Sequence, residues 1–147
     1  MRAVAQRVER AAIRVAGETV GAMGPGLLAL VGVGRGDGPE AAAELASRLV
    51  HLRVFEDAEG RMNRALLETG GALGVVSQFT LFGDARKGRR PSFVEAASPE
   101  QAEPLVRVFA DALSALGATV ATGVFGAHMD VELVNDGPVT LMLEVSA

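Results

Sequence analysis

The 147-residue sequence contains no cysteine, no tyrosine and no tryptophan. The lack of cysteine excludes a disulfide framework, a thiolate metal site and a cysteine nucleophile, and it is typical of a reducing compartment. Any aromatic stacking surface must come from the six phenylalanines. The longest apolar run, residues 27–33, is too short to span a bilayer, and the charged first ten residues do not resemble a signal peptide. We therefore expect a cytoplasmic protein.

Hydrophobic residues make up 49% of the chain and charged residues 22%, which is typical of a folded domain with a core. The length predicts a single domain over residues 1–147. A net charge of −4 means that the surface as a whole does not favour nucleic acid. One local exception is the basic cluster, which consists of Arg86, Lys87, Arg89 and Arg90.

Most of the chain has the pattern of strands. Residues 2–8 and 12–16 alternate polar and apolar positions, and Ala16-Gly17-Glu18 is a candidate hairpin turn. The apolar run "GLLALVGV" at 26–33 is typical of a strand buried on both faces. Further strands are predicted at 52–55, 72–82, 118–125 and within 131–145.

Two segments have helical periodicity. Residues 40–52 follow a Gly-Pro pair and carry an apolar stripe of Ala42, Leu45, Ala46, Leu49 and Val50. Residues 99–116 begin with a capping signal at Ser98 and end before Gly117, with Pro104 expected to disturb the first turn. The sequence thus predicts an α+β domain, with a mostly antiparallel sheet or partial barrel and two main helices.

The sequence offers few residues for metal or phosphate binding. Neither His51 nor His128 lies in a metal-binding spacing, and the stretch "GVGRGDG" lacks the pattern of a phosphate loop, so we expect no metal and no cofactor. A Ser-His-Asp triad stays open because its members need not be near in sequence. Ser77, however, is not in a Gly-x-Ser-x-Gly turn.

The stretch "SQFTL" at 77–81 interleaves polar and apolar residues within an apolar strand. Alternation would put Ser77, Phe79 and Leu81 on one face, and Gln78 and Thr80 on the other. One interpretation is an edge strand whose polar groups face water. The other is a strand end whose hydroxyls and amides line a pocket, where main-chain N–H groups hold a developing oxyanion.

A second unusual stretch is "VELVNDGPVTLMLEV" at 131–145, which indicates two strands with a corner at residues 135–138. An Asn-Asp-Gly turn would already reverse the chain, so the added proline needs a reason. A trans turn is the ordinary interpretation, because only about 5–6% of X-Pro bonds in folded proteins are cis.

Together, "SQFTL" at 77–81 and "NDGPVT" at 135–140 resemble two motifs of the D-aminoacyl-tRNA deacylase family, enzymes that check chirality in translation. The stretches "MRAVAQRV", "GLLALVGV", "RPSF", "ASPEQAE" and "TGVFGAHM" also occur in the family's order. The resemblance implies an ester hydrolase that releases free amino acid from D-aminoacyl-tRNA and glycyl-tRNA. It further implies a homodimer that binds the aminoacylated 3′ end of tRNA, with no membrane and no DNA partner.

The resemblance gives the corner a function. It implies that the Gly137-Pro138 bond is cis and enters the active site of the other subunit, where its two carbonyls accept hydrogen bonds from the substrate's α-ammonium. An L side chain would then collide with this wall, whereas hydrogen or a D side chain would not. Arg7 resembles an arginine that braces this loop. From the residues alone, Arg7 is equally an ordinary surface charge on a strand.

The resemblance also implies that Ser77, Gln78, Phe79 and Thr80 surround the scissile ester, with the amides of Gln78 and Phe79 nearest to it. Thr80 is a candidate nucleophile in this family. A threonine hydroxyl needs a base, however, and the sequence offers no evident one. We therefore favour assistance by the ribose hydroxyl next to the ester, while the protein supplies positioning and an oxyanion site.

Phe125 and Met129 resemble residues of a pocket for the terminal adenosine. Phe125 is equally interpretable as a core residue, and for Met129 core packing is the more ordinary interpretation. The basic cluster would contact tRNA phosphates, or it is simply a solvated loop. Two alternatives to the deacylase remain open. One is a small-molecule esterase with Ser77 or Thr80 as a covalent nucleophile, and the other is a non-catalytic RNA-binding dimer.

Overall fold

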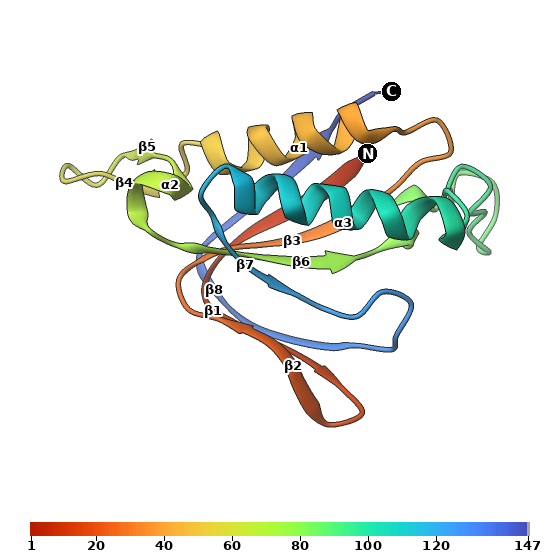
Figure 1. The fold of residues 1–147 in the computed structure, drawn as a ribbon, viewed down its shortest axis with the longest axis horizontal. Helices are drawn as coiled ribbons and strands as arrows, with labels where there is room; N and C mark the ends of the chain where they lie inside the picture. The colour runs from red at the N-terminus through yellow and green to blue at the C-terminus, as the bar shows by residue number, and fades with distance from the viewer. Residues whose placement is uncertain (147) are drawn as a thin grey trace.

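The sheet is organised around its first strand, β1 (Arg2–Val15) (Figure 1). In the computed structural model, which describes residues 1–146, β2 (Glu18–Met23) and β3 (Gly26–Gly32) pair antiparallel with successive parts of β1. The last strand, β8 (Asp130–Glu144), pairs antiparallel with β1 from Arg2 to Arg14. Since a strand has only two edges, β2 and β3 share one edge of β1 and β8 occupies the other.

The prediction of two separate strands at 2–8 and 12–16 is wrong, because both belong to β1. Residues 9–11 continue the strand, and the irregularity lies in the pairing with β8, whose register shifts on either side of Val8. The predicted hairpin after β1 is confirmed. Ala16 and Gly17 have φ of 50° and 83°, the positive values that a two-residue hairpin turn requires.

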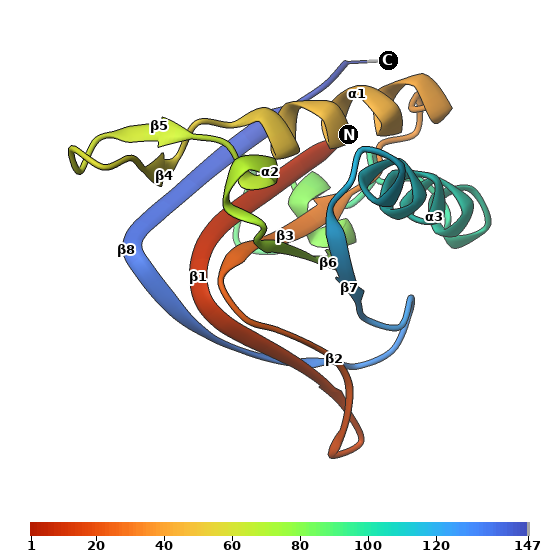
Figure 2. The ribbon, with the colours of Figure 1, turned by 60° about the vertical axis from the view of Figure 1, so that its left-hand side comes forward.

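The other half of the sheet is parallel. β6 (Ala72–Ser77) pairs parallel with β3, and β7 (Thr119–Thr122) pairs parallel with β6. Parallel neighbours need a crossover, and the two long helices supply the two crossovers. At the far edge, a side-chain carbon on Gly21 would lie 2.6 Å from the carbonyl oxygen of Thr122, so β2 approaches β7 and the sheet is nearly closed (Figure 2).

Helices α1 (Pro39–His51) and α3 (Pro99–Ala115) lie side by side over one face of the sheet (Figures 1 and 2). The predicted apolar stripe of α1 is fully buried. Ser98 caps α3 by accepting a hydrogen bond from the Gln101 amide, and Pro104 does not interrupt the helix. Within residues 1–146, no helix combines the length and hydropathy that a transmembrane segment requires.

Apolar side chains form two clusters. The larger lies between the helices and the sheet and includes Leu45, Leu49, Leu73 and Phe109. The smaller lies inside the curled sheet and consists of Val8, Ala11, Ile13, Leu28 and Val76. The predicted α+β single domain with a partial barrel and two main helices is confirmed, whereas the sequence did not reveal the two parallel pairings.

Three short elements complete the fold: the strands β4 (Phe55–Glu56) and β5 (Met62–Arg64), which form a hairpin, and the one-turn helix α2 (Leu66–Thr69). The prediction of one strand over 72–82 is wrong beyond Ser77. There the chain enters the 3₁₀ helix η1 (Phe79–Phe82). A side-chain carbon on Gly34 would lie only 2.8 Å from the Phe82 ring, so the glycine leaves room for η1 to fold back onto the sheet.

Candidate functional site

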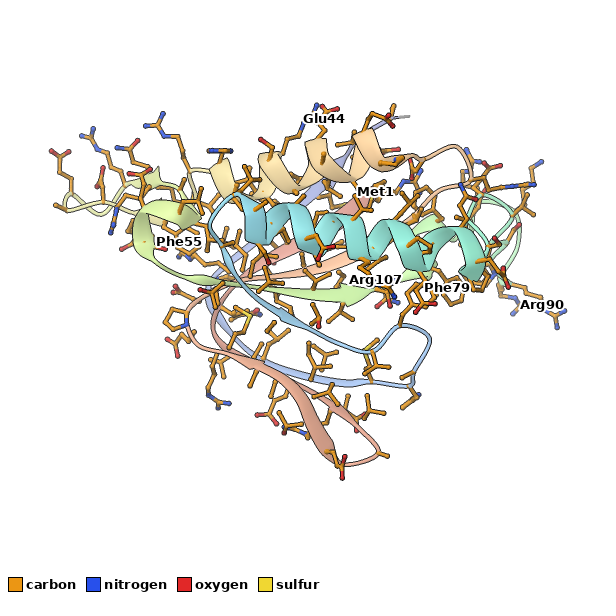
Figure 3. All side chains as sticks on the ribbon, in the orientation of Figure 1. Met1, Glu44, Phe55, Phe79, Arg90 and Arg107 are labelled. Carbon is orange, nitrogen blue, oxygen red and sulfur yellow. The ribbon has the colours of Figure 1, made fainter. Side chains whose placement is uncertain are left out.

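The principal pocket, of about 590 Å³, opens where β6 ends. Its walls come from the first turns of α3, from residues 77–79 and from the segment 125–131 that leads into β8. It brings together five of the predicted site residues, Ser77, Gln78, Phe79, Phe125 and Met129. Figure 3 shows Phe79 beneath the N-terminal half of α3. Thr80, Gly137 and Pro138 are outside its lining.

The polar groups of "SQFTL" are arranged by η1 rather than by strand alternation. The amide of Gln78 donates to the carbonyl oxygen of Val31 at 2.7 Å, so it is not free to hold an oxyanion as expected. The amide of Phe79, in the first turn of η1, has no acceptor within residues 1–146. The side-chain amide of Gln78 donates to the Thr80 hydroxyl. Of the two predicted oxyanion donors, only the Phe79 amide is therefore available.

No general base is joined to a hydroxyl at this pocket. His128 lines the pocket and its Nε2 lies 3.9 Å from the Asp130 carboxylate. No hydrogen bond in the described part of the chain links His128 to Ser77 or Thr80. His51 lies at the end of α1, hydrogen-bonded to the main chain of Ser47. A Ser-His-Asp triad is therefore not assembled in this structure.

Phe125 and Met129 are both pocket residues and core residues, the two interpretations that the sequence left open. Both side chains line the pocket. Phe125 is half-buried and also packs against the larger apolar cluster, whereas Met129 packs against the smaller one. Core packing therefore fixes the positions of both residues, and each still presents part of its surface to the pocket.

Gly137 and Pro138 lie within β8, so the predicted corner between two strands is instead an irregularity in one continuous strand. Their peptide bond is cis, as the resemblance implied, and the bonds before Pro25 and Pro39 are not. Both residues are exposed and outside the pocket of their own chain.

Arg7 is the buried charged residue beside this irregularity, with only 6% of its surface exposed. Its Nε donates to the main-chain oxygen of Asp136 at 3.1 Å and lies 3.3 Å from the Asp136 carboxylate. Its Nη1 donates to the carbonyl oxygen of Val54 at 2.6 Å. The surface-charge interpretation of Arg7 is wrong, because these contacts tie it to the residue before Gly137.

The basic cluster lies on an exposed loop at the same end of the molecule as Phe79, as the label of Arg90 in Figure 3 shows. Two main-chain hydrogen bonds between Asp84 and Ser92, of 2.7 and 2.8 Å, close this loop. The Arg86 guanidinium binds both oxygens of the Asp84 carboxylate, at 2.9 and 2.7 Å, and lowers the pKa of Asp84 to about 2. One of the four cations is thus already paired with a carboxylate.

The structure adds Phe93 to the pocket, a residue to which sequence reasoning gave no role. Its ring packs edge-to-face against Phe79, with centroids 5.2 Å apart. The "RPSF" stretch that contains it was visible in the sequence, but nothing local indicates that its ring meets the first residue of η1.

Comparison with known proteins identifies the family. The family model described as D-Tyr-tRNA(Tyr) deacylase matches residues 4–144. A protein of Thermomicrobium roseum named D-aminoacyl-tRNA deacylase is 59% identical over 144 residues, which cover 98% of this chain and 94% of that protein. A protein of Thermus aquaticus with the same name is 56% identical over 99% of this chain and 96% of its own length.

Two solved structures have the same fold. One, titled c-Myc DNA Unwinding Element Binding Protein, aligns over 100% of both chains with a TM-score of 0.95 and 37% identity. The other, titled as a probable eukaryotic D-amino acid tRNA deacylase, aligns over 98% of both chains with a TM-score of 0.84 and 18% identity. The family match and the identities above 50% show that the chain belongs to the D-Tyr-tRNA(Tyr) deacylase family.

Proposed function

We propose that the protein is a D-aminoacyl-tRNA deacylase, which hydrolyses the ester between a D-amino acid and the terminal ribose of tRNA. The observation that carries this proposal is the family match over residues 4–144. The pocket supports it further, because it joins residues of "SQFTL" to residues of "TGVFGAHM" in one cavity of about 590 Å³. A cavity of this size lies in the range of small-ligand sites.

The chemistry proposed is hydrolysis assisted by the substrate. Water attacks the ester carbonyl carbon, the bond from that carbon to the ribose oxygen breaks, and a proton from the water passes to the ribose oxygen. The adjacent ribose hydroxyl orients the water, and the Phe79 amide is the candidate donor to the oxyanion. This scheme is supported by the lack of an activated nucleophile in the protein. Thr80 accepts a hydrogen bond from Gln78, and no base is joined to Ser77 or Thr80 within residues 1–146.

We further propose that selection against L-substrates needs two copies of the chain. This proposal is supported by the exposure of Gly137 and Pro138 and by their position outside the pocket of their own chain, because a second copy would bring them to the ester. Their carbonyls would accept hydrogen bonds from the substrate's amino group, and the remaining space at Cα would admit hydrogen or a D side chain but not an L side chain. Glycyl-tRNA would therefore also be hydrolysed.

The test is release of amino acid from D-tyrosyl-, L-tyrosyl- and glycyl-tRNA, measured together with the molecular mass of the protein in solution. Hydrolysis of the D and glycyl substrates but not the L substrate by a dimer is the expected result. Equal hydrolysis of D- and L-tyrosyl-tRNA would contradict the selection. Turnover of simple esters with trapping by acylating reagents would favour the small-molecule esterase. Binding of tRNA without release would favour the non-catalytic dimer.

A further inference from the structure

Two aromatic rings lie exposed on the same wall of the pocket. Phe79 is 57% exposed and Phe93 is 39% exposed, and both line the cavity. Their rings pack edge-to-face, with centroids 5.2 Å apart and planes at 65°. Each ring therefore keeps part of its surface in water while its neighbour supports it. The adenosine pocket that the family resemblance implied involves Phe125 and Met129, so it does not account for this exposed aromatic surface.

The main chain holds the Phe93 ring in place. The pairing of Asp84 with Ser92 closes the loop immediately before it, and the carbonyl oxygen of Phe93 accepts a hydrogen bond from the Ala96 amide at 3.1 Å. A side-chain carbon on Gly83 would lie 3.0 Å from the Phe93 ring, so this glycine lets the ring lie against the backbone. A ring that is positioned in advance costs little ordering when a ligand stacks on it.

Positive charge lies directly beside this aromatic pair. The loop that ends at Ser92 carries Arg86, Lys87, Arg89 and Arg90, all exposed. A surface with stacking rings next to cations is the arrangement by which proteins bind single-stranded nucleic acid, the rings taking bases and the cations taking phosphates. An amino-acid side chain would use the rings but would gain nothing from the cations.

We propose that the Phe79–Phe93 pair stacks the base of the nucleotide that precedes the terminal adenosine, as the single-stranded 3′ end passes from the pocket towards the basic cluster. This inference rests on the proposed function, because it extends the same site along the tRNA. Stacking does not read base identity, so the pair increases affinity for the strand rather than for a sequence. Phe93 then binds the nucleotide chain of the substrate and does not contact the ester.

The experiment compares D-tyrosyl esters of adenosine and of the trinucleotide CpCpA, with hydrolysis and binding both measured. The wild-type protein should have a lower KM for the trinucleotide ester. Phe93→Leu keeps an apolar side chain but loses the flat ring, so it should remove this advantage by raising KM roughly five- to hundredfold for the trinucleotide ester alone, with kcat unchanged. Phe93→Tyr should keep the advantage. Val94→Ala, at the exposed neighbouring residue, is the matched control.

Three outcomes would overturn the inference. The first is an equal rise in KM on both esters in Phe93→Leu, and the second is no rise on either. The third is a rise with D-tyrosyl esters but not with D-alanyl esters, which would assign the pair to the amino-acid side chain. Binding of unacylated CpCpA and of adenosine provides a second readout that does not require catalysis. If the wild-type protein releases no amino acid from D-tyrosyl-tRNA, the proposed function fails, and the effect of Phe93→Leu on CpCpA binding still decides the stacking.

Discussion

The Nε of Arg7 lies 3.1 Å from the main-chain oxygen of Asp136, although 129 residues separate the two in sequence. The same guanidinium reaches the carbonyl oxygen of Val54. Arg7 therefore links the start of the chain, the segment before β4 and the residue before Gly137. A planar guanidinium presents several donors in fixed directions, and a lysine ammonium does not.

Arg7→Lys tests whether this link positions the selecting loop. Lysine keeps the charge, but its donors radiate from a single nitrogen, whereas the two carbonyl oxygens are bound by different nitrogens of the guanidinium, Nε and Nη1. We expect discrimination between D- and L-tyrosyl-tRNA to fall and the free energy of unfolding to drop by about 1–3 kcal/mol. Arg10→Lys on the same strand is the control, because Arg10 pairs with Glu132 at the exposed surface. Unchanged discrimination in Arg7→Lys would separate Arg7 from selection.

Gly137→Ala tests the loop directly. Gly137 has φ of +133°, and a side-chain carbon there would lie 2.9 Å from the Val139 nitrogen. The strain, of about 1–3 kcal/mol, is relieved if the Gly137 carbonyl moves. We expect kcat/KM for D-tyrosyl-tRNA to fall. Gly24→Ala is the matched control, since Gly24 also precedes proline but has open space around it and no positive φ. Equal effects of the two substitutions would contradict the role of Gly137.

Thr80→Val tests the proposed chemistry. Because the Thr80 hydroxyl already accepts a hydrogen bond from Gln78 and no base is joined to it within residues 1–146, its removal should leave most of the activity. A substrate ending in 2′-deoxyadenosine, with the amino acid on the 3′ oxygen, should lose a factor of about 10²–10⁴ in rate, the usual contribution of a positioned acid or base. Detection of an amino acid covalently attached to Thr80 by mass spectrometry would contradict substrate assistance.

Local patterns predicted the elements that local forces determine. The α1 stripe, the Ser98 cap and the Ala16-Gly17 turn depend on neighbours within a few residues, and each is confirmed. The end of β6 at Ser77 was missed because it depends on contacts between η1 and glycines more than 40 residues earlier in the chain. The parallel pairings of β6 were also missed, because they join β6 to β3 and β7, which are distant from it in sequence.

In the candidate site, too, the features set by local sequence could be predicted and those set by distant contacts could not. The motif at 77–81 could be identified from its unusual polarity, and the pocket contains its first three residues. The burial of Arg7 could not be predicted, because its two carbonyl partners lie 47 and 129 residues away. The sequence also could not predict that the Gln78 amide donates to Val31 and is therefore not free for an oxyanion, since this hydrogen bond depends on the pairing of β6 with β3.

Asp37→Asn should destabilise the fold strongly. The Asp37 carboxylate lies 2.8 Å from the Met1 ammonium, with both side chains buried, and it also accepts the Gly34 amide at 2.6 Å. The substitution leaves a buried ammonium without its counter-charge, which costs about 3–5 kcal/mol. Urea denaturation measures this loss in the free energy of unfolding. The protein must carry no N-terminal extension, because an extension would remove the Met1 ammonium. Glu44→Gln removes a pair of 2.6 Å with Arg48 at the surface and should cost only about 0.3–0.5 kcal/mol.

Asp84→Asn should strengthen tRNA binding. The Arg86 guanidinium lowers the pKa of Asp84 to about 2, so the carboxylate is ionised at neutral pH and remains paired with Arg86. Removing its charge frees Arg86 for a phosphate, which would make the slope of log affinity against log salt more negative by roughly 0.7–0.9. Asp57→Asn changes the net charge equally and serves as the control, because the Asp57 carboxylate accepts main-chain amides of Glu59 and Arg61 and pairs with no guanidinium in the described part of the chain. Equal salt slopes in the two variants would show that Arg86 contacts no phosphate, and the basic cluster would then be a solvated loop at that position.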